Sequence, residues 1–231
     1  DEVVGIDVNV ENLFSDTEGR KLESLYEFLK TEMERVRKEQ RNLSRKQEGS
    51  NNWQKQKRKL AQAYEDLVNK RDDILHKLSN WYVENYKLIA VEDIDSKELS
   101  ENGDGLGKYI RSQAWSRLVE FVEYKASQAG VRVERVNPEY TSQDCSNPIC
   151  ENREKKSLDE RDHSCDKCGF EADRDVNAAW NVLFKGFERV RCEEDVDLGQ
   201  GLSELTPVET DTAGGTLVSL IAVVEAGSPT L

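Results

Sequence analysis

Four of the five cysteines lie in two close pairs, with the spacing of a tetrahedral metal site. Four residues separate Cys145 from Cys150, two separate Cys165 from Cys168, and Gly169 follows the second pair. Thiolates select a soft or borderline metal ion, so two such pairs in one segment predict a four-thiolate zinc site. Because four protein ligands leave no open coordination position, we expect this Zn²⁺ to be structural rather than catalytic.

Other residues leave alternatives open around this pattern. His163 could replace one thiolate, although a polar loop residue is the favoured interpretation. Cys192, the fifth cysteine, is interpreted as a free thiol in a tail. No secretion signal is apparent, which favours metal binding over a disulfide framework, and buried cysteines without a metal are the remaining alternative.

Two acidic residues lie in apolar, strand-like runs, and a third opens a helix. Asp7 lies inside VVGIDV, and Glu92 lies near the end of LIAVED. Each could be an ordinary ion-pair partner, because an unpaired buried carboxylate is costly. Together with Asp175 they predict a cluster of oxygen ligands, which needs cations to offset its repulsion and suits Mg²⁺. Two such ions about 3.5–4 Å apart can bind both the attacking and the leaving oxygen of a phosphodiester.

Charge is distributed unevenly along the 231 residues. The net charge of −13 argues against a nucleic-acid-binding protein, whose footprint is normally basic. Residues 35–59 nevertheless carry ten Lys and Arg against two Glu, whereas the sequence after residue 186 carries nine acids against two Arg. The basic stretch is interpreted either as a solvated helix face or as a phosphate-contacting surface.

Strand-like and helical segments alternate along the chain, which predicts an α/β sheet. The expected strands are 3–8, 87–94 and 131–136, where β-branched and apolar residues dominate. The expected helices are 21–46, 53–83, 108–130 and 175–184, from apolar residues at helical spacing. A turn is expected at DTEG (16–19), a loop at SENGDGLG (100–107), and a helical hairpin around EGSNN. No apolar run is long enough to cross a membrane.

An ordered set of motifs resembles a known family. VGIDVNVENLF, LSRKQEGSNNWQKQKRKLA, NKRDDILHKLS, LIAVEDI, AWSRLVEFVEYKASQAGVRVERVNPEYTSQDCS and CDKCGFEADRDVNAAWNVL follow one another over roughly residues 3–185. Together they are similar to the C-terminal half of the TnpB (OrfB) family of transposon-associated RNA-guided nucleases, relatives of the type V CRISPR effectors.

The resemblance implies an α/β fold of the RNase H-like (RuvC-like) type with two insertions. The implied nuclease domain covers 1–187, with a helical-hairpin insertion at 21–83 and a zinc-ribbon insertion at 141–172. Residues 188–231 are expected to form an acidic, disordered tail. By the family pattern, Asp7, Glu92 and Asp175 take the places of the catalytic acids that bind Mg²⁺, for which Mn²⁺ can substitute. The four paired cysteines match the family's zinc ligands.

The implied activity is DNA hydrolysis, with DNA and a transposon-derived guide RNA as partners. The alternatives are a transposon remnant that binds nucleic acid without cutting it and an accessory transposase. We expect a cytoplasmic protein with no membrane association, and the acidic excess fits a salt-rich, haloarchaeal cytoplasm. The chain begins with Asp rather than Met, so we expect a fragment or a processed product. The sequence gives no indication of oligomeric state, guide or target motif.

Overall fold

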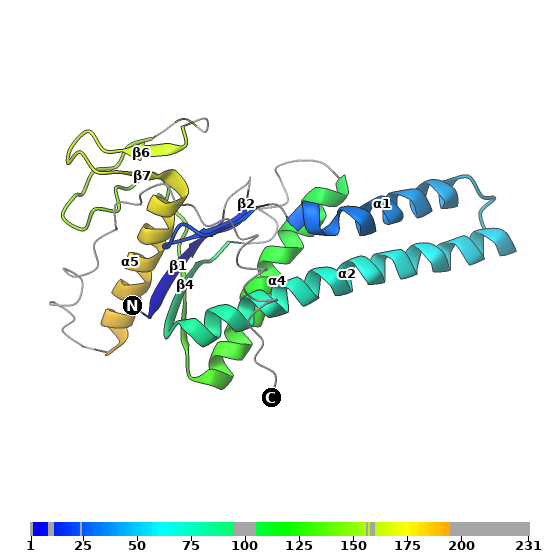
Figure 1. The fold of residues 1–231 in the computed structure, drawn as a ribbon, viewed down its shortest axis with the longest axis horizontal. Coiled ribbons are helices and arrows are strands. Elements are labelled where there is room, and N and C mark those ends of the chain that lie inside the picture. The colour runs from blue at the N-terminus through cyan, green and yellow to red at the C-terminus, as the bar shows by residue number, and fades with distance from the viewer. Residues whose placement is uncertain are drawn as a thin grey trace.

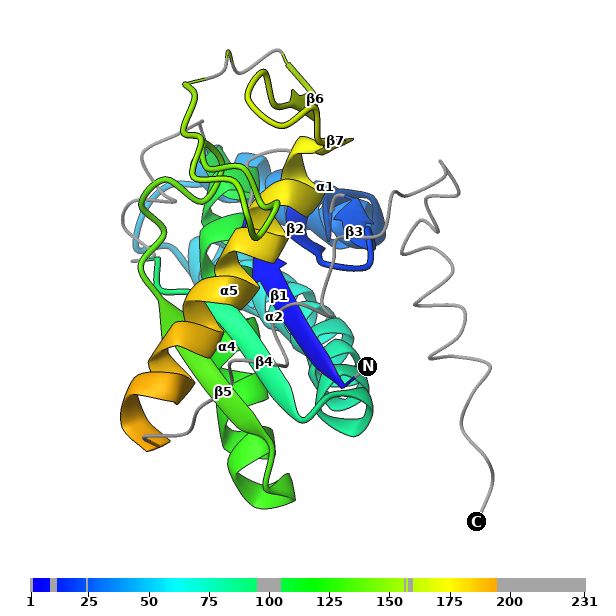
Figure 2. The same cartoon turned by 90° about the vertical axis from the view of Figure 1, so that its left-hand side faces the viewer.

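A five-stranded sheet forms the centre of the molecule. The computed structural model describes residues 2–8, 12–23, 25–94, 105–155, 157 and 160–194. Within them, α5 covers one face of the sheet, while α4 and the end of α2 cover the other (Figures 1 and 2). The mixed α/β class expected from the sequence is therefore confirmed.

The strand order is β3-β2-β1-β4-β5. Three strands run parallel at its centre and one edge: β1 (Val3–Asp7), β4 (Leu88–Glu92) and β5 (Arg132–Val136). They match the three strands expected from the sequence. An antiparallel hairpin of β2 (Asn12–Asp16) and β3 (Lys21–Glu23) completes the other edge. Its turn contains Gly19 at a φ of +76°, a conformation that glycine adopts without steric cost.

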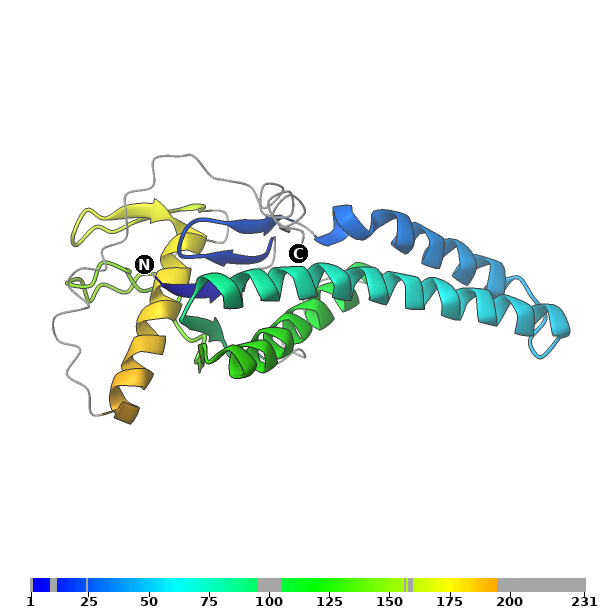
Figure 3. The ribbon, with the colours of Figure 1, turned by 60° about the horizontal axis from the view of Figure 1, so that its bottom comes forward.

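Two long helices project from the sheet as an arm. They are α1 (Leu25–Ser44) and α2 (Asn51–Asn85), which lie side by side and extend well beyond the rest of the molecule (Figures 1 and 3). Ser50 ends the turn between them, because its side chain accepts a hydrogen bond from the amide of Trp53 at 3.1 Å and caps α2. The two helices expected around EGSNN are thus confirmed.

The remaining described elements follow the chain past the sheet. Helix α4 (Gly105–Ala129) leads into β5, and Gly130 ends it at a φ of +72°. Two short strands, β6 (Asp162–Ser164) and β7 (Glu171–Asp173), form a separate hairpin that precedes α5 (Arg174–Glu194). No helix within the ranges given above is both long and apolar enough to cross a membrane.

Three expected boundaries are wrong. Residues 21–23 pair with β2 as an edge strand instead of opening the first helix, because strand pairing decides the conformation of so short a segment. Helix α4 begins at Gly105, inside the expected loop. Helix α5 continues ten residues past its expected end to Glu194, so Cys192 lies on a helix rather than in a tail. The rest of the expected tail, from residue 195 onward, lies outside the described residues.

The two faces of the central strands differ in the size of their side chains. Val4 and Ile6 of β1, like Ile89 and Val91 of β4, belong to the large core shared with α1, α2 and α4. Successive strand residues point to opposite faces, so Gly5 and Ala90 point toward α5. Ala90 accordingly packs with Val182 and Leu183 of α5. Small residues on this face let the helix axis approach the sheet closely.

Gly5→Ala is expected to destabilise the fold by forcing α5 away from β1. A Cβ atom at this position would lie 2.1 Å from the carbonyl oxygen of Ala179 and 2.8 Å from the Cβ of Leu183. The oxygen belongs to helix backbone and cannot rotate away. We expect a loss at the top of the usual overpacking range, about 3 kcal/mol, or about 6–12 °C in Tm, measured by thermal denaturation.

Gly49→Ala is the matched control for this substitution. Gly49 lies in the α1–α2 turn at a φ of +78°, with nothing within 4 Å of an added Cβ. Its replacement incurs only the backbone cost of a left-handed alanine, about 1–2 kcal/mol. A Gly5→Ala protein as stable as Gly49→Ala would contradict the close approach of α5 to β1.

A buried polar network fixes the β2–β3 hairpin to α2. Asp16 has no solvent exposure and accepts hydrogen bonds from the Nε of Arg20 at 2.7 Å and the hydroxyl of Tyr82 at 2.9 Å. Burial raises the pKa of Asp16, although Arg20 acts against this rise. The guanidinium of Arg20 also lies over the ring of Trp81, 4.5 Å from its centroid. The start of β3 is therefore held in a defined position.

Candidate active site

Asp7 and Glu92 end two neighbouring parallel strands. Ile6 of β1 lies opposite Val91 of β4, so the two acids follow this pair side by side at the carboxyl edge of the sheet. Each lies two residues after a residue that faces α5, which places both carboxyl groups on that face. Both are buried, with exposed fractions of 6% for Asp7 and 4% for Glu92.

The electrostatics of this pair oppose double ionisation. Burial, the charge of Glu92 and the charge of Asp175 together raise the pKa of Asp7 well above its usual value. Burial also raises the pKa of Glu92, although hydrogen bonds from the hydroxyl of Thr141 at 2.7 Å and the amide of Val8 at 3.2 Å act in the opposite direction. A positive charge beside the pair would let both carboxyl groups ionise.

Asp175 lies in the first turn of α5, near this pair. Its negative charge is one of the causes that raise the pKa of Asp7. The preceding acid, Asp173, caps the helix by accepting hydrogen bonds from the amides of Asp175 at 2.9 Å and Val176 at 3.3 Å. The cap fixes where the Asp175 side chain leaves the helix.

The three acids are more widely spaced than the cysteines. Among the described residues, only the four cysteines form a group of three or more potential ligands whose ligand atoms all lie within 4.8 Å of one another. The predicted sharing of metal ions by Asp7, Glu92 and Asp175 therefore stays a prediction. Carboxylates spaced more widely than the ligands of a single ion would suit a pair of divalent ions better than one.

The four cysteines of the second cluster converge on one point. The Sγ atoms of Cys145 and Cys168 are 3.7 Å apart, as are those of Cys150 and Cys165. Tetrahedral coordination with metal–sulfur distances of about 2.3 Å places sulfur atoms about 3.8 Å apart, so the four thiols can hold a zinc ion. Burial opposes ionisation of Cys165, but the amides of Cys168 and Lys167 and the neighbouring thiols outweigh it and lower its pKa to about 6.

His163 lies outside this group of ligands. The structure shows it buried in β6, with its ring 6.2 Å from the ring of Phe170. The favoured interpretation, a polar loop residue, is wrong, because His163 is buried and lies in β6, where it pairs with Ala172 of β7.

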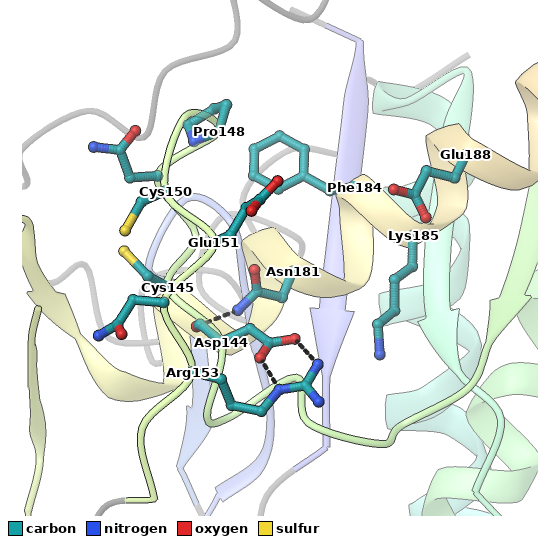
Figure 4. Close-up of a pocket in the computed structure, with 12 residues that line it drawn as sticks. Asp144, Cys145, Pro148, Cys150, Glu151, Arg153, Asn181, Phe184, Lys185 and Glu188 are labelled. Carbon is teal, nitrogen blue, oxygen red and sulfur yellow. Dashed lines mark hydrogen bonds and ion pairs between the residues drawn. The ribbon is translucent and has the colours of Figure 1, made fainter. Parts of the chain in front are cut away.

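Two asparagines attach the cysteine-bearing segment to α5. Asn177 has no solvent exposure; its side chain donates to the carbonyl of Asp144 at 2.8 Å and accepts from the amide of Ser146 at 2.9 Å. Asn181, one helical turn later, donates to the carbonyls of Asp144 and Thr141 at 2.7 and 2.8 Å. These bonds hold the residues on both sides of Cys145 in place. Figure 4 shows the bond between Asn181 and Asp144.

Thr141 connects this attachment to the acidic pair. Its carbonyl accepts from Asn181, and its hydroxyl donates to the carboxylate of Glu92. The thiol cluster and the acids are thus joined by a short chain of hydrogen bonds through α5. Thr141, Asn177 and Asn181 are not predicted as site residues from the sequence, although the two asparagines have i,i+4 spacing and lie close to the acid that opens the helix.

A cleft of about 720 Å³ lies between the cysteine-bearing segment and α5 (Figure 4). Arg153 pairs with Asp144 on one side, and Lys185 and Glu188 of α5 lie on the other. None of the three predicted catalytic acids lines it. The cleft is therefore separate from the acidic pair.

The fold and these two clusters define an α/β protein with acids at the ends of parallel strands and a four-thiol centre. The structure of a "CRISPR-Cas12f Ternary Complex" matches 79% of this chain and 38% of that chain, with a TM-score of 0.59 and 19% identity. A "Cas12f1-sgRNA-target DNA complex" matches with a TM-score of 0.53 and 20% identity, over 79% of this chain and 49% of that chain. At this identity, the matches establish similarity of fold.

Sequence comparisons give the family. Residues 1–103 match a family described as "Probable transposase" (OrfB_IS605), and residues 115–182 match "Cas12f1-like, TNB domain". "Putative RNA-guided DNA endonuclease InsQ" of Escherichia coli is 33% identical over 87% of this chain and 53% of its own length. A "Putative RNA-guided DNA endonuclease" of Streptomyces pristinaespiralis is 33% identical over 84% of this chain and 47% of its own length. The chain belongs to the TnpB/OrfB family, and it spans about half the length of these relatives.

Proposed function

We propose that this chain is the nuclease part of an RNA-guided DNA endonuclease, with an RNase H-like (RuvC-like) fold and Asp7, Glu92 and Asp175 as its metal-binding acids. The observation that carries the proposal is the buried pair of Asp7 and Glu92 at the ends of adjacent parallel strands. Burial and mutual repulsion make this pair a poor site for two bare charges and a good site for divalent cations. The relatives named as RNA-guided DNA endonucleases support the same assignment.

The donor set suits Mg²⁺, with Mn²⁺ as a substitute. All three side chains offer hard carboxylate oxygens, and among the described residues Asp175 has a side-chain partner through only one of its two oxygens. When bound, such ions stabilise the charge that develops on a phosphodiester and lower the pKa of attacking water. The chain's own part is positional: the sheet fixes two acids, the helix cap fixes the third, and Thr141 orients Glu92.

The four cysteines would hold Zn²⁺ in a structural role. Four thiolates leave no position for substrate, so the ion would stabilise the segment that β6 and β7 belong to. We also propose a division of the chain into a nuclease domain at 1–187 with two insertions. The helical arm is the insertion at 21–83, and the zinc ribbon is the insertion at 141–172.

The tip of the helical arm is the proposed contact for a nucleic-acid partner. Seven exposed cations there have no carboxylate within 4.0 Å in the described part of the chain: Arg41, Arg45, Lys46, Lys55, Lys57, Arg58 and Lys59. Nearer the sheet the cations are paired, as Arg35 is with Asp66 and Lys70 with Glu32. Unpaired cations at the end of a helix about 50 Å long favour phosphate contact over a neutralised surface.

Neutralising the tip is expected to weaken the salt-dependent part of nucleic-acid binding. Glutamine at Lys55, Lys57, Arg58 and Lys59 would remove up to four phosphate contacts, so the magnitude of the slope of log K against log salt should fall by up to about 3.6 for a DNA duplex of about 20 base pairs. The measurement is fluorescence anisotropy over a salt series, with RNA and DNA duplexes of one sequence. Glutamine at the paired Lys70 and Lys77 is the control. If the salt dependence of binding had the same slope in both variants, the proposed contact between the tip of the arm and nucleic acid would be wrong.

A second candidate is a transposon remnant that binds nucleic acid without cutting it. The unpaired cations of the arm suit this role equally well, whereas the buried acidic pair has no part in it. An accessory role in transposition is a further alternative. Nicking of a supercoiled plasmid in Mg²⁺ or Mn²⁺ separates cutting from binding. We expect nicks with either ion, none in excess EDTA, and none with Asp7→Ala; equal nicking by the wild-type and Asp7→Ala proteins would contradict the enzymatic role.

A further inference from the structure

Lys21 joins the edge of the sheet to the start of α5. Its Nζ lies 2.8 and 2.7 Å from the two carboxylate oxygens of Asp173 and 3.1 Å from Oδ2 of Asp175. The two aspartates follow Lys21 by 152 and 154 residues. These interatomic distances place the Nζ of Lys21 between the two carboxylates, in contact with both.

Both oxygens of Asp173 are engaged. Oδ1 accepts from the amides of Asp175 and Val176 and from Lys21, and Oδ2 accepts from Lys21. Asp175 differs, because in the described part of the chain only its Oδ2 has a side-chain partner. Asp175 therefore keeps one oxygen available as a ligand, whereas both oxygens of Asp173 are in use.

The two aspartates could compete with the proposed site. Their carboxylates contact one ammonium, so they lie within reach of a single small cation. Two carboxylates at this separation would attract a divalent ion if the ammonium were absent. An ion bound there would draw Asp175 toward Asp173 and away from Asp7 and Glu92.

We propose that Lys21 is a positioning residue that occupies the space between Asp173 and Asp175 and so reserves Asp175 for metal shared with Asp7 and Glu92. This inference rests on the proposed function. Lys21 acts through Asp175 rather than through the acidic pair itself. Its place on β3, held by the Asp16 network, gives the ammonium a fixed position relative to α5.

The test compares Lys21→Met, Lys21→Arg and the double variant Lys21→Met/Asp173→Asn. Mn²⁺ binding is measured by isothermal titration calorimetry and plasmid nicking by single-turnover kinetics, after circular dichroism has established folding. Lys21→Met should bind Mn²⁺ about tenfold more tightly, because a neighbouring positive charge is lost. It should nick about 10²-fold more slowly, because Asp175 is misplaced. Lys21→Arg should stay close to wild type in both.

The double variant separates this role from a structural one. An asparagine side chain in place of the Asp173 carboxylate would still cap α5 but could not form a bridging site with Asp175, so the wild-type Mn²⁺ affinity and most of the nicking rate should return. Lys21→Met with wild-type Mn²⁺ affinity would overturn the inference, as would failure of the double variant to recover. If replacing Asp7 left Mn²⁺ binding unchanged, the proposed function would be contradicted, and this inference with it.

Discussion

Asp7→Asn is expected to lower the rate of plasmid nicking by about 10³-fold. The amide keeps the size of the side chain but removes the negative charge and one ligand of the proposed metal pair. Without this ligand, the metal pair would stabilise the transition state less well. Each ~1.4 kcal/mol of lost stabilisation slows the reaction about tenfold, so a loss of several kcal/mol gives a factor of this size. Single-turnover nicking in saturating Mn²⁺ measures the effect.

The same substitution should leave the metal-free protein at least as stable as wild type. The pKa of Asp7 is raised in the fold, so the native state holds this proton more tightly than the unfolded chain. In EDTA, wild-type stability should therefore fall as pH rises from about 4, the unfolded value, through the raised value. The amide in the variant has no proton to lose in this range, so thermal denaturation between about pH 5 and 8 should show a smaller slope for Asp7→Asn than for wild type.

Asp93→Asn is the matched control. Asp93 follows Glu92 directly, is exposed, and pairs with Arg135 at 3.2 Å at the surface. Its replacement should change neither nicking nor the pH dependence of stability by a measurable amount, since an exposed ion pair is worth about 0–1 kcal/mol. If Asp7→Asn lost activity only in proportion to a loss of folded protein, Asp7 would be a structural acid and the proposed site would be wrong.

The parts of the fold that the sequence predicted are those with a strong local pattern. The three parallel strands consist of apolar β-branched runs, and α2 carries apolar residues at helical spacing over 35 residues. The edge strand β3 and the hairpin of β6 and β7 have three residues in each strand, so their conformation depends on pairing partners that no local window contains. Beyond the expected end of α5, Phe187 packs against a cluster that contains Ala90 of β4 and Val136 of β5, which are likewise distant in sequence.

The candidate site likewise contains some residues that the sequence predicts and others that only the tertiary structure shows. Cys145, Cys150, Cys165 and Cys168 were found from spacing alone, and the structure brings their sulfur atoms together. Asp7 and Glu92 stand out in the sequence because a carboxylate within an apolar strand is unusual. Lys21, Thr141 and Asn181 are ordinary polar residues in the sequence, and only the tertiary structure shows that they contact the acids or the helix that carries one. Residues that position a site depend on long-range contacts, which a single sequence does not display.

Loss of the thiol-bound metal is expected to reduce nicking although the acids remain. Cys165→Ala removes one of four ligands, and metal binding supplies much of the folding free energy of such a small segment. Unfolding it would release Asp144 and Ser146 from α5 and break the bond from Thr141 to Glu92. We expect a loss of about one zinc per chain, measured by atomic emission, and faster hydrogen exchange over residues 141–173. Nicking should fall about 10- to 100-fold, as for a misplaced catalytic group.

Two further substitutions test whether loss of the metal lowers the nicking rate through the hydrogen bond between Thr141 and Glu92. Cys192→Ala alters the cysteine outside the four-thiol group and should keep both the zinc and the activity. Thr141→Val removes the hydroxyl bonded to Glu92 while leaving every zinc ligand in place. If the hydrogen-bond chain connects the two centres, this protein should retain its zinc and its exchange protection yet nick about tenfold more slowly, the effect of losing one hydrogen bond to a charged group. Full activity in Thr141→Val, with low activity in Cys165→Ala, would show that the thiol centre supports the acids through some other contact, such as the helix cap at Asp173 that ends β7.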